Sequence, residues 1–238
     1  MFEPTYPLAL PAHVNSGIYG RYQVIYADPP WAFRAWGQPN RKITGGRVAE
    51  AYYPTMSTEA ICRLPVAELA APDCALFLWG VWPSLPDALK VGEAWGFTYK
   101  TLAFDWLKRS PNGGAWHTGL GYWTRANSEP CLLFTKGSPR RKSKGVKQII
   151  ADVGQGELMP PIIDRLTVHS AKPFEAYRRI EALLEGPFLE LFARVSWPGW
   201  DAWGNQAPNG IDWRPVWETR AQEHAAGVEQ LALAGVMR

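Results

Sequence analysis

The sequence is poor in metal-binding residues and has no long hydrophobic run. Its three cysteines, Cys62, Cys74 and Cys131, are far apart without metal-ligand spacing, and its four histidines form no HExxH motif or Cys/His cluster. We therefore expect no metal site, and reduced thiols in a cytoplasmic protein. No run approaches the length of a transmembrane helix, and the first residues lack the pattern of a secretory signal, so we expect no membrane association.

The sequence also lacks internal repeats and any linker that would divide it. With 238 residues, 47% of them hydrophobic and 20% charged, it fits one globular domain over 1–238. We expect an irregular lead-in over 1–21 and a partly helical tail over 207–238. Thirteen tryptophans are many for this length and predict core or subunit-interface packing, which is compatible with a homodimer.

Apolar runs and helical periodicity alternate along the chain. We expect helices over about 58–70, 84–95 and 172–185, a short apolar segment over 146–153, and strands over 22–28, 75–79, 99–107, 129–136 and 188–195. This alternation predicts an α/β fold with a mostly parallel sheet and helices on both faces. The segments 32–55 and 108–124 are longer than simple connectors and are candidate functional loops.

Asp28-Pro29-Pro30-Trp31 directly follows the apolar run Val24-Ile25-Tyr26-Ala27. The prolines end the strand and fix the backbone, and ligands of open α/β sheets bind at the carboxyl ends of strands. A carboxylate, free backbone carbonyls and an aromatic face suit the exocyclic amine of a flipped nucleobase, which indicates an adenine N6-methyltransferase. For the tetrapeptide alone, ordinary turn chemistry with a core tryptophan is an equally good interpretation.

A second group of polar residues lies late in the chain. Lys172 opens an amphipathic helix, Glu190 and Arg194 fall in the next expected strand, and Asn205-Gln206 follow. One sheet edge with cations, carboxylates and amides suits S-adenosylmethionine, whose own carboxylate and ribose hydroxyls need such partners. Taken singly, each residue has a simpler explanation: Glu190 and Arg194 share a strand face and could form an ion pair.

The net charge of +3 does not by itself indicate a nucleic-acid-binding protein. The basic residues are unevenly distributed, however, and form two runs: Arg34, Arg41, Lys42 and Arg47, and then Arg140, Arg141, Lys142, Lys144 and Lys147. Such runs are more often solvated loops. Close to a motif that grips a nucleobase, they favour contact with phosphates.

The chain resembles the N6-adenine methyltransferase family named after the 70-kDa subunit of the mRNA adenosine methyltransferase. The matching pieces keep the family's order over roughly residues 22–206, which is far more specific than one tetrapeptide. They are Ala27 to Trp31, Tyr53-Pro54-Thr55-Met56-Ser57, Leu76-Phe77-Leu78-Trp79, Gly121-Tyr122-Trp123, Glu129 to Gly137, His169-Ser170-Ala171-Lys172-Pro173, Glu190 to Arg194 and Gly204-Asn205-Gln206. The resemblance is closer to short bacterial and phage members than to the long eukaryotic subunits.

The resemblance implies a Rossmann-like methyltransferase fold in a circularly permuted order, with the cofactor half after the catalytic motif. It implies that Asp28, Pro29, Pro30 and Trp31 form the catalytic motif, with Asp28 and Trp31 at the target base and Pro29 offering its carbonyl. Tyr53 would close over the site, and Arg34 and Lys142 are our candidates for further substrate contact. The implied residues for S-adenosylmethionine are Asp28, Lys172, Glu190, Arg194, Asn205 and Gln206.

The sequence departs from the family in two ways. Val195-Ser196-Trp197 stands where eukaryotic members place a histidine and an asparagine that contact the cofactor ribose, so we transfer no ribose contact there. The G-x-G phosphate fingerprint is absent too.

We expect methyl transfer from S-adenosylmethionine to N6 of adenine in DNA. The same reaction on RNA is the alternative, and an inactive subunit of a heterodimer is a third, which the intact Asp28 disfavours. Glutamine and cytosine N-methyltransferases use a similar turn but usually begin it with Asn or Ser and end it with Tyr. Asp28 and Trp31 therefore favour adenine.

Overall fold

The computed structural model describes residues 20–32, 55–108, 116, 118–119, 123–151 and 172–204. Its strands are β1 (Tyr22–Ala27), β2 (Ala70–Trp79), β3 (Thr98–Leu107), β4 (Ser128–Lys136), β5 (Ile149–Ala151), β6 (Phe188–Leu191) and β7 (Trp200–Trp203). Its helices are α1 (Thr58–Cys62), α2 (Val66–Leu69), the 3₁₀ turn η2 (Trp82–Ser84), α3 (Leu85–Ala94) and α4 (Phe174–Leu183).

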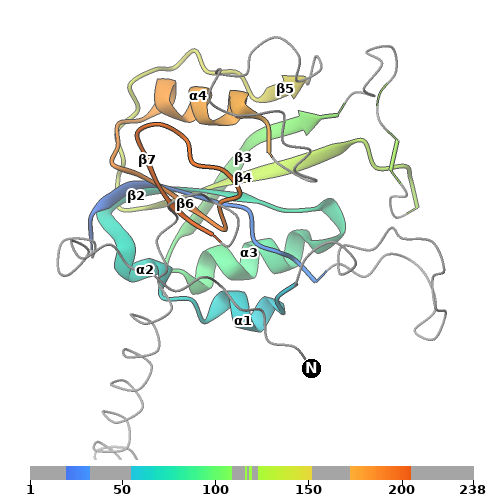
Figure 1. Ribbon diagram of the computed structural model, residues 1–238, viewed down its shortest axis with the longest axis horizontal. Helices are drawn as coiled ribbons and strands as arrows, with labels where there is room; N and C mark the ends of the chain where they lie inside the picture. Colours follow the sequence, from blue (N-terminus) through green and yellow to red (C-terminus); the bar gives the residue numbers. More distant parts are fainter. Residues whose placement is uncertain are drawn as a thin grey trace, which may run out of the picture.

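The strands form one seven-stranded sheet in the order β5-β3-β4-β2-β1-β6-β7 (Figure 1). β4 pairs antiparallel with both β2 and β3, and every other strand pair in the described sheet is parallel. The prediction of a mostly parallel α/β sheet is confirmed. β1 lies between β2 and β6, and hence near the middle of the sheet.

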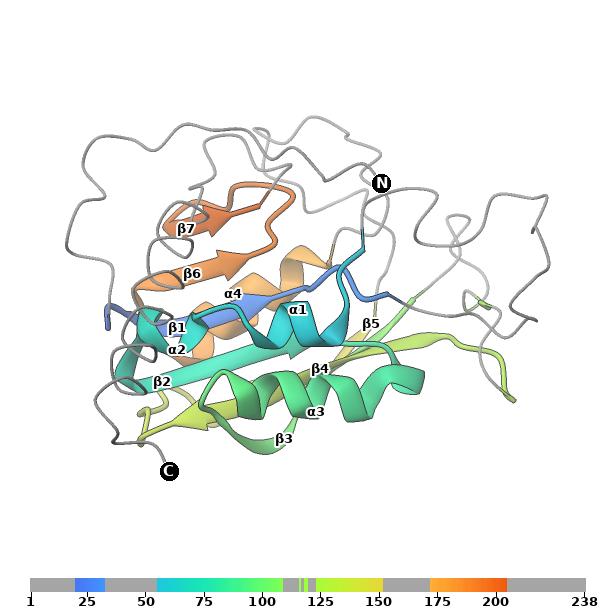
Figure 2. The ribbon, with the colours of Figure 1, turned by 90° about the horizontal axis from the view of Figure 1, so that it is seen from below.

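Helices cover both faces, as the alternating pattern predicts: α1, α2 and α3 lie on one face and α4 on the other (Figure 2). β1 faces both layers, because Ile25 packs into the core under α1 to α3 while Val24 and Tyr26 pack into the core under α4. A central parallel strand buried on both sides is expected to be apolar throughout, and β1 has this pattern. No helix in the described ranges has the length and apolar character needed to cross a bilayer.

The expected helix over 58–70 is instead two short helices. Ser57 caps α1, since its hydroxyl accepts a hydrogen bond from the Ala60 amide at 3.1 Å. Pro65 then disfavours helical backbone at Leu64, which ends the first helix and separates it from α2. β2 begins directly after α2, at Ala70, five residues earlier than expected.

The expected strand over 188–195 is too long. β6 ends at Leu191 because Phe192 takes a left-handed conformation with φ of 63°. Glu190 and Arg194 therefore do not share a strand face, and that prediction was wrong. The sequence prediction also missed β7, a four-residue strand that follows a turn at Gly199, where φ is 82°.

One close contact fixes α3 on the sheet. Gly92 lies in the last turn of this helix, and a Cβ atom there would come within 2.2 Å of Cε1 of the buried Phe134 in β4. The missing side chain lets the helix backbone approach β4, which lies between β2 and β3 in the sheet.

Candidate active site

Asp28 stands at the carboxyl end of β1, where the chain leaves the middle of the sheet. The strands next to β1 are β2 and β6, both parallel to it, so three carboxyl ends meet at this edge. In open α/β sheets a crevice forms where connections from a central strand diverge to either side. The turn that follows is held by two backbone hydrogen bonds, from the Trp31 amide to the Pro29 carbonyl and from the Met56 amide to the Pro30 carbonyl, both 2.8 Å long.

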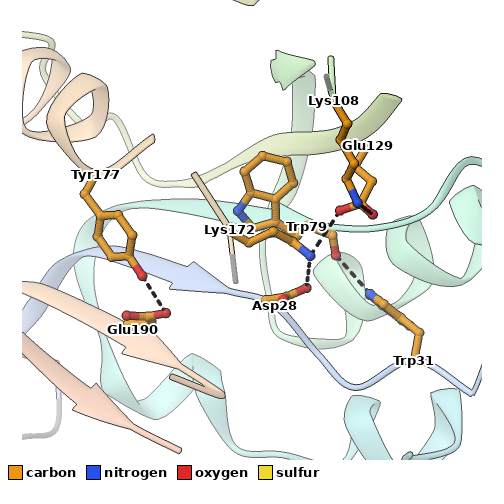
Figure 3. Close-up of polar contacts among 8 residues, drawn as sticks. All are labelled: Asp28, Trp31, Trp79, Lys108, Glu129, Lys172, Tyr177 and Glu190. Carbon is orange, nitrogen blue, oxygen red and sulfur yellow. Dashed lines mark hydrogen bonds and ion pairs between the residues drawn. The ribbon is translucent and has the colours of Figure 1, made fainter. Parts of the chain in front are cut away.

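Lys172 forms the centre of a charged cluster at this edge (Figure 3). Its Nζ lies 2.9 Å from Oδ1 of Asp28 and 3.2 Å from Oε2 of Glu129, and its side chain is only 8% exposed. Lys108 pairs with the other oxygen of Glu129. The four side chains thus form an alternating chain of two carboxylates and two ammonium groups whose charges cancel.

The pairing keeps Glu129 and Lys172 ionised. Burial alone favours the neutral acid, but Lys172 and Lys108 outweigh it and hold the pKa of Glu129 at about 2. Burial acts against the Lys172 ammonium too, yet Asp28 and Glu129 raise the pKa of this lysine above its ordinary value. At neutral pH Lys172 is therefore a fixed cation that positions Asp28, and it does not act as a base.

The sequence prediction missed Glu129 and Lys108 as site residues. Glu129 begins a strand instead of ending one, and it reaches this edge only because β4 runs opposite to its neighbours. Lys108 had a usable signal, because it comes directly after the strand expected over 99–107.

Trp31 has a different environment from the open aromatic face that the sequence predicts. Its side chain is buried, with 8% exposure, and its indole Nε1 donates to the Trp79 carbonyl at 3.0 Å. This contact joins the Asp-Pro-Pro-Trp turn to the end of β2, while the Trp79 ring lies 5.5 Å from the Lys172 ammonium. The structure thus shows Trp31 as a support of the turn, and stacking of Trp31 on a base stays a prediction.

Glu190 lies in the adjoining strand β6, level with Tyr26 of β1 and so two residues before Asp28. Its side chain is buried, and Tyr177 of α4 donates its hydroxyl proton to Oε1 at 2.8 Å (Figure 3). Among the described residues, Oε2 has no hydrogen-bond partner. Burial raises the pKa of Glu190 to about 8, with the negative charge of Asp28 adding to the effect, so the carboxyl group is mostly protonated at neutral pH.

Arg194 is described, and its positive charge acts on the Glu190 carboxyl group; the five other predicted site residues fall into two groups. Tyr53, Arg34, Asn205 and Gln206 lie outside the described residues. Lys142 is described, but the structure does not bring it to the site: its amide donates to the Leu183 carbonyl at the C-terminal end of α4, and its ammonium pairs with Glu185 at 3.0 Å. Lys172 precedes the other end of α4, so the whole helix separates Lys142 from Asp28.

Comparison with known proteins agrees with this arrangement. The family model of MT-A70 matches residues 22–206, which include β1 to β7 and the whole charged cluster. The chain belongs to the MT-A70 family. As a member of this family it is a methyltransferase, and the mixed sheet is the Rossmann-like fold that the resemblance implies.

Two kinds of MT-A70 relatives are similar to the chain. The type II methyltransferase M.MunI of a Mycoplasma species is 32% identical over 203 residues, covering 79% of this chain and 79% of the relative. The human N(6)-adenosine-methyltransferase catalytic subunit METTL3 is 28% identical over 212 residues, covering 87% of this chain but 32% of the relative. An Arabidopsis thaliana MT-A70-like N(6)-adenosine-methyltransferase is 29% identical over 198 residues, covering 82% of this chain and 25% of the relative. The chain thus spans about a third or less of these larger eukaryotic relatives.

Proposed function

We propose that this protein transfers a methyl group from S-adenosylmethionine to N6 of an adenine in DNA, with Asp28 as the residue that holds the amine. The observation that carries the proposal is the position of the Asp28 carboxylate. Asp28 directly follows the central strand β1 at the start of the hydrogen-bonded turn, and its Oδ1 lies 2.9 Å from Nζ of a buried lysine. A surface aspartate in an ordinary turn would need no such buried partner.

The described residues fit S-adenosylmethionine. Glu190 offers a buried carboxyl oxygen without a partner among the described residues, and Asp28 and Lys172 supply opposite charges for an amino-acid moiety. Gly204 lies so close to Ala193 that a Cβ atom would come within 2.0 Å of the Ala193 carbonyl oxygen, so Gly204 packs against the segment that follows β6. When bound, the cofactor supplies an electrophilic methyl group on a positively charged sulfur. Arg194, Asn205 and Gln206 complete the proposed cofactor set. That the catalytic motif precedes the cofactor half in a circularly permuted order stays a prediction.

The protein's task is to orient a poor nucleophile. The lone pair of the adenine amine is delocalised into the ring, so the amine must be held with this lone pair turned towards the methyl group. We assign Oδ2 of Asp28 to one N6–H, because Oδ1 faces Lys172. The Pro29 carbonyl accepts the other N6–H with its second lone pair, since the first already accepts from the Trp31 amide. Positioning of this kind supplies several kcal/mol, up to roughly 7–11 in ideal cases.

Fixed acceptors also stabilise the positive charge that grows on N6 during methyl transfer. The proton on N6 becomes far more acidic once transfer has begun, so Asp28 need not be a strong base beforehand. The adenine must leave its base stack to reach this edge, at a cost of a few kcal/mol. We propose that contacts with Trp31 and Tyr53 offset part of this cost.

The relatives support DNA over RNA. The type II methyltransferase of Mycoplasma matches over most of its own length, whereas the N(6)-adenosine-methyltransferases of animals and plants match over a minor part of theirs. The same chemistry on RNA is the second candidate, favoured by the number of those N(6)-adenosine relatives.

The direct experiment supplies labelled S-adenosylmethionine with single-stranded DNA, duplex DNA or RNA and identifies the modified nucleoside by mass spectrometry. We expect N6-methyladenine in DNA. N6-methyladenine in RNA alone would replace the proposal with its alternative. Its absence from all three substrates would overturn both.

The role of Asp28 has its own test. In the Asp28→Ala variant we expect turnover to fall at least about a hundredfold, because a preorganised acceptor for the developing charge is lost. S-adenosylmethionine affinity, measured by calorimetry, should change far less than turnover. Asp87→Asn, a surface change in the first turn of α3, is the control that should leave turnover unchanged. Undiminished turnover in Asp28→Ala would contradict the assignment.

A further inference from the structure

The basic run that does not reach the active site forms a surface of its own. Between Gly137 and Ala151 the chain has five cationic side chains and no acidic one. All five are exposed: Arg140, Arg141, Lys142, Lys144 and Lys147. We refer to residues 138–148 as the basic segment. Within the described part of the chain, Lys142 is the one member of the five with an ion pair.

The basic segment runs along one side of the molecule. It leaves β4 at Lys136, at the edge of the sheet opposite Asp28, and passes the C-terminal end of α4, where the Lys142 amide donates to Leu183. It then enters β5, which is parallel to β3 and forms the outer strand of the sheet. The segment therefore leads from the far edge of the sheet back towards the edge that holds the site (Figure 1).

The backbone of the segment is held in place, which distinguishes it from an ordinary solvated loop. Arg179 of α4 donates through Nη1 to the carbonyls of Lys147 and Ile149, each at 2.7 Å, and is itself fixed by Glu175 at 2.9 Å. Gln148 donates through Nε2 to the Leu102 carbonyl at 2.6 Å. The protein's own contacts thus order the backbone, so a ligand that binds the cationic side chains does not have to supply this ordering energy.

Of three carboxylates on α4 or directly after it, two are paired with a cation and the third is hydrogen-bonded to neutral groups. Glu175 pairs with Arg179, Glu185 pairs with Lys142, and Glu181 accepts hydrogen bonds from the indoles of Trp197 and Trp200. Arg178 adds a further exposed cation on α4. The positive charge of the basic segment therefore faces solvent without full compensation.

We propose that the basic segment binds the phosphate backbone of the nucleic acid several nucleotides away from the target adenine. This inference rests on the proposed function and adds to it a second contact with the same substrate. Arginines and lysines interleaved with serine and glycine suit phosphates. A membrane surface would call for large apolar side chains between the cations, and the segment contains none larger than Val146.

The geometry gives the spacing. Lys147 lies one residue before Gln148, whose carbonyl accepts from the Asp105 amide, so Lys147 is level with about residue 103 of β3. From there β3 runs about five residues to Lys108 at the site, or roughly 17 Å at 3.3 Å per residue. A duplex rises about 3.4 Å per base pair, so the contact falls roughly five base pairs from the target. A substrate that extends less than this distance from the target adenine cannot reach the basic segment.

The test compares two matched double variants by fluorescence anisotropy with labelled DNA of about 24 and about 4 nucleotides. Arg141→Gln with Lys144→Gln removes two charges from the basic segment, and Arg63→Gln with Lys90→Gln removes two exposed charges on the α1 and α3 side. We expect only the first pair to weaken binding of the long DNA, by at least about tenfold at 0.1 M salt, and to reduce the salt slope by about one per lost phosphate contact. Binding of the short DNA should not change.

Two results would overturn the proposal: a salt slope that the first pair leaves unchanged, or an equal loss in both pairs. Loss of binding to vesicles with anionic lipid, without any loss for DNA, would assign the surface to membranes and also refute it. The assay involves no methyl transfer. If the protein methylates no substrate but the first pair of variants still lowers the salt slope as expected, the proposed function is refuted and the proposed binding surface is supported.

Discussion

Lys172 shows how a single buried side chain can organise a site. Its ammonium binds Asp28 and Glu129 together, and Lys108 closes the cluster from the other side of Glu129. Because the charges cancel within the cluster, its burial is tolerated, but the loss of one member leaves another charge buried without a partner.

Glu129→Gln tests this dependence. We expect a loss of about 3–5 kcal/mol in the free energy of unfolding, measured by urea denaturation at pH 7, because a buried pair is broken and Lys172 loses one of its two partners. The control is Glu59→Gln, which breaks the exposed pair with Lys90 at 3.4 Å, and there the expected loss is below about 1 kcal/mol. Equal small losses in both variants would show that the cluster contributes little to stability.

Glu190 should make the stability of the folded protein fall as the pH rises, which is the opposite of the effect of a paired carboxylate. Its pKa is about 8 in the folded protein and near 4.5 in the unfolded chain, so the folded state binds more protons between these values. The contribution of the protonated Glu190 carboxyl group to the free energy of unfolding is fully present below pH 4.5 and is lost as the pH rises towards 8. Glu190→Gln keeps a neutral side chain at every pH. Thermal melts should therefore show the variant gaining stability over the native protein from pH 5 to pH 8, by about 1.4 kcal/mol per pH unit at most. A constant difference across this range would contradict the assignment.

At the scale of elements, α3 is fixed by its glycine. In Gly92→Ala the new methyl group would meet the buried Phe134 ring, which has no room to move inside the core. Overpacking costs about 1–3 kcal/mol, and the higher helix propensity of alanine returns up to about 1 kcal/mol. We expect net destabilisation in chemical denaturation. Glu93→Ala, at the exposed neighbouring position, should change stability by less than about 0.5 kcal/mol. A stabilised Gly92→Ala would mean that α3 moves away from β4 at little cost.

Elements with a strong local signal could be predicted from the sequence. The apolar run of β1 and the amphipathic pattern of α4 depend on neighbours in the chain, and both were located within about two residues. The end of β6 and the existence of β7 depend on the left-handed backbone at Phe192 and on pairing with β6, and neither leaves a local pattern. The same distinction applies to the site: Asp28 and Lys172 follow from motifs, whereas Glu129 depends on the direction of β4.

At the scale of the whole molecule, β1 joins the two halves of the sheet. It pairs with β2 on one side and, after more than a hundred residues, with β6 on the other, so the site exists only when distant parts of the chain are assembled. A ligand that spans this assembly should stabilise the fold as a unit.

S-adenosylmethionine should therefore raise the melting temperature. At a hundred times its dissociation constant the expected stabilisation is about 2.7 kcal/mol, which for a domain of this size is roughly 5–10 °C. Scanning calorimetry or dye fluorescence measures the shift, with adenosine monophosphate as the control ligand. No shift at saturating cofactor would contradict the proposed cofactor set.

The chain between Lys108 and Asn127 is anchored at both ends. The Lys108 amide donates to the Asn127 carbonyl at 3.2 Å, and its ammonium pairs with Glu129 two residues later. Each doubling in length of a loop with fixed ends costs only about 0.6 kcal/mol, so segments of very different length can be inserted here without moving Glu129 or Lys172. This makes the position a natural graft point, where a segment of different length or sequence can be exchanged while the charged cluster stays where it is.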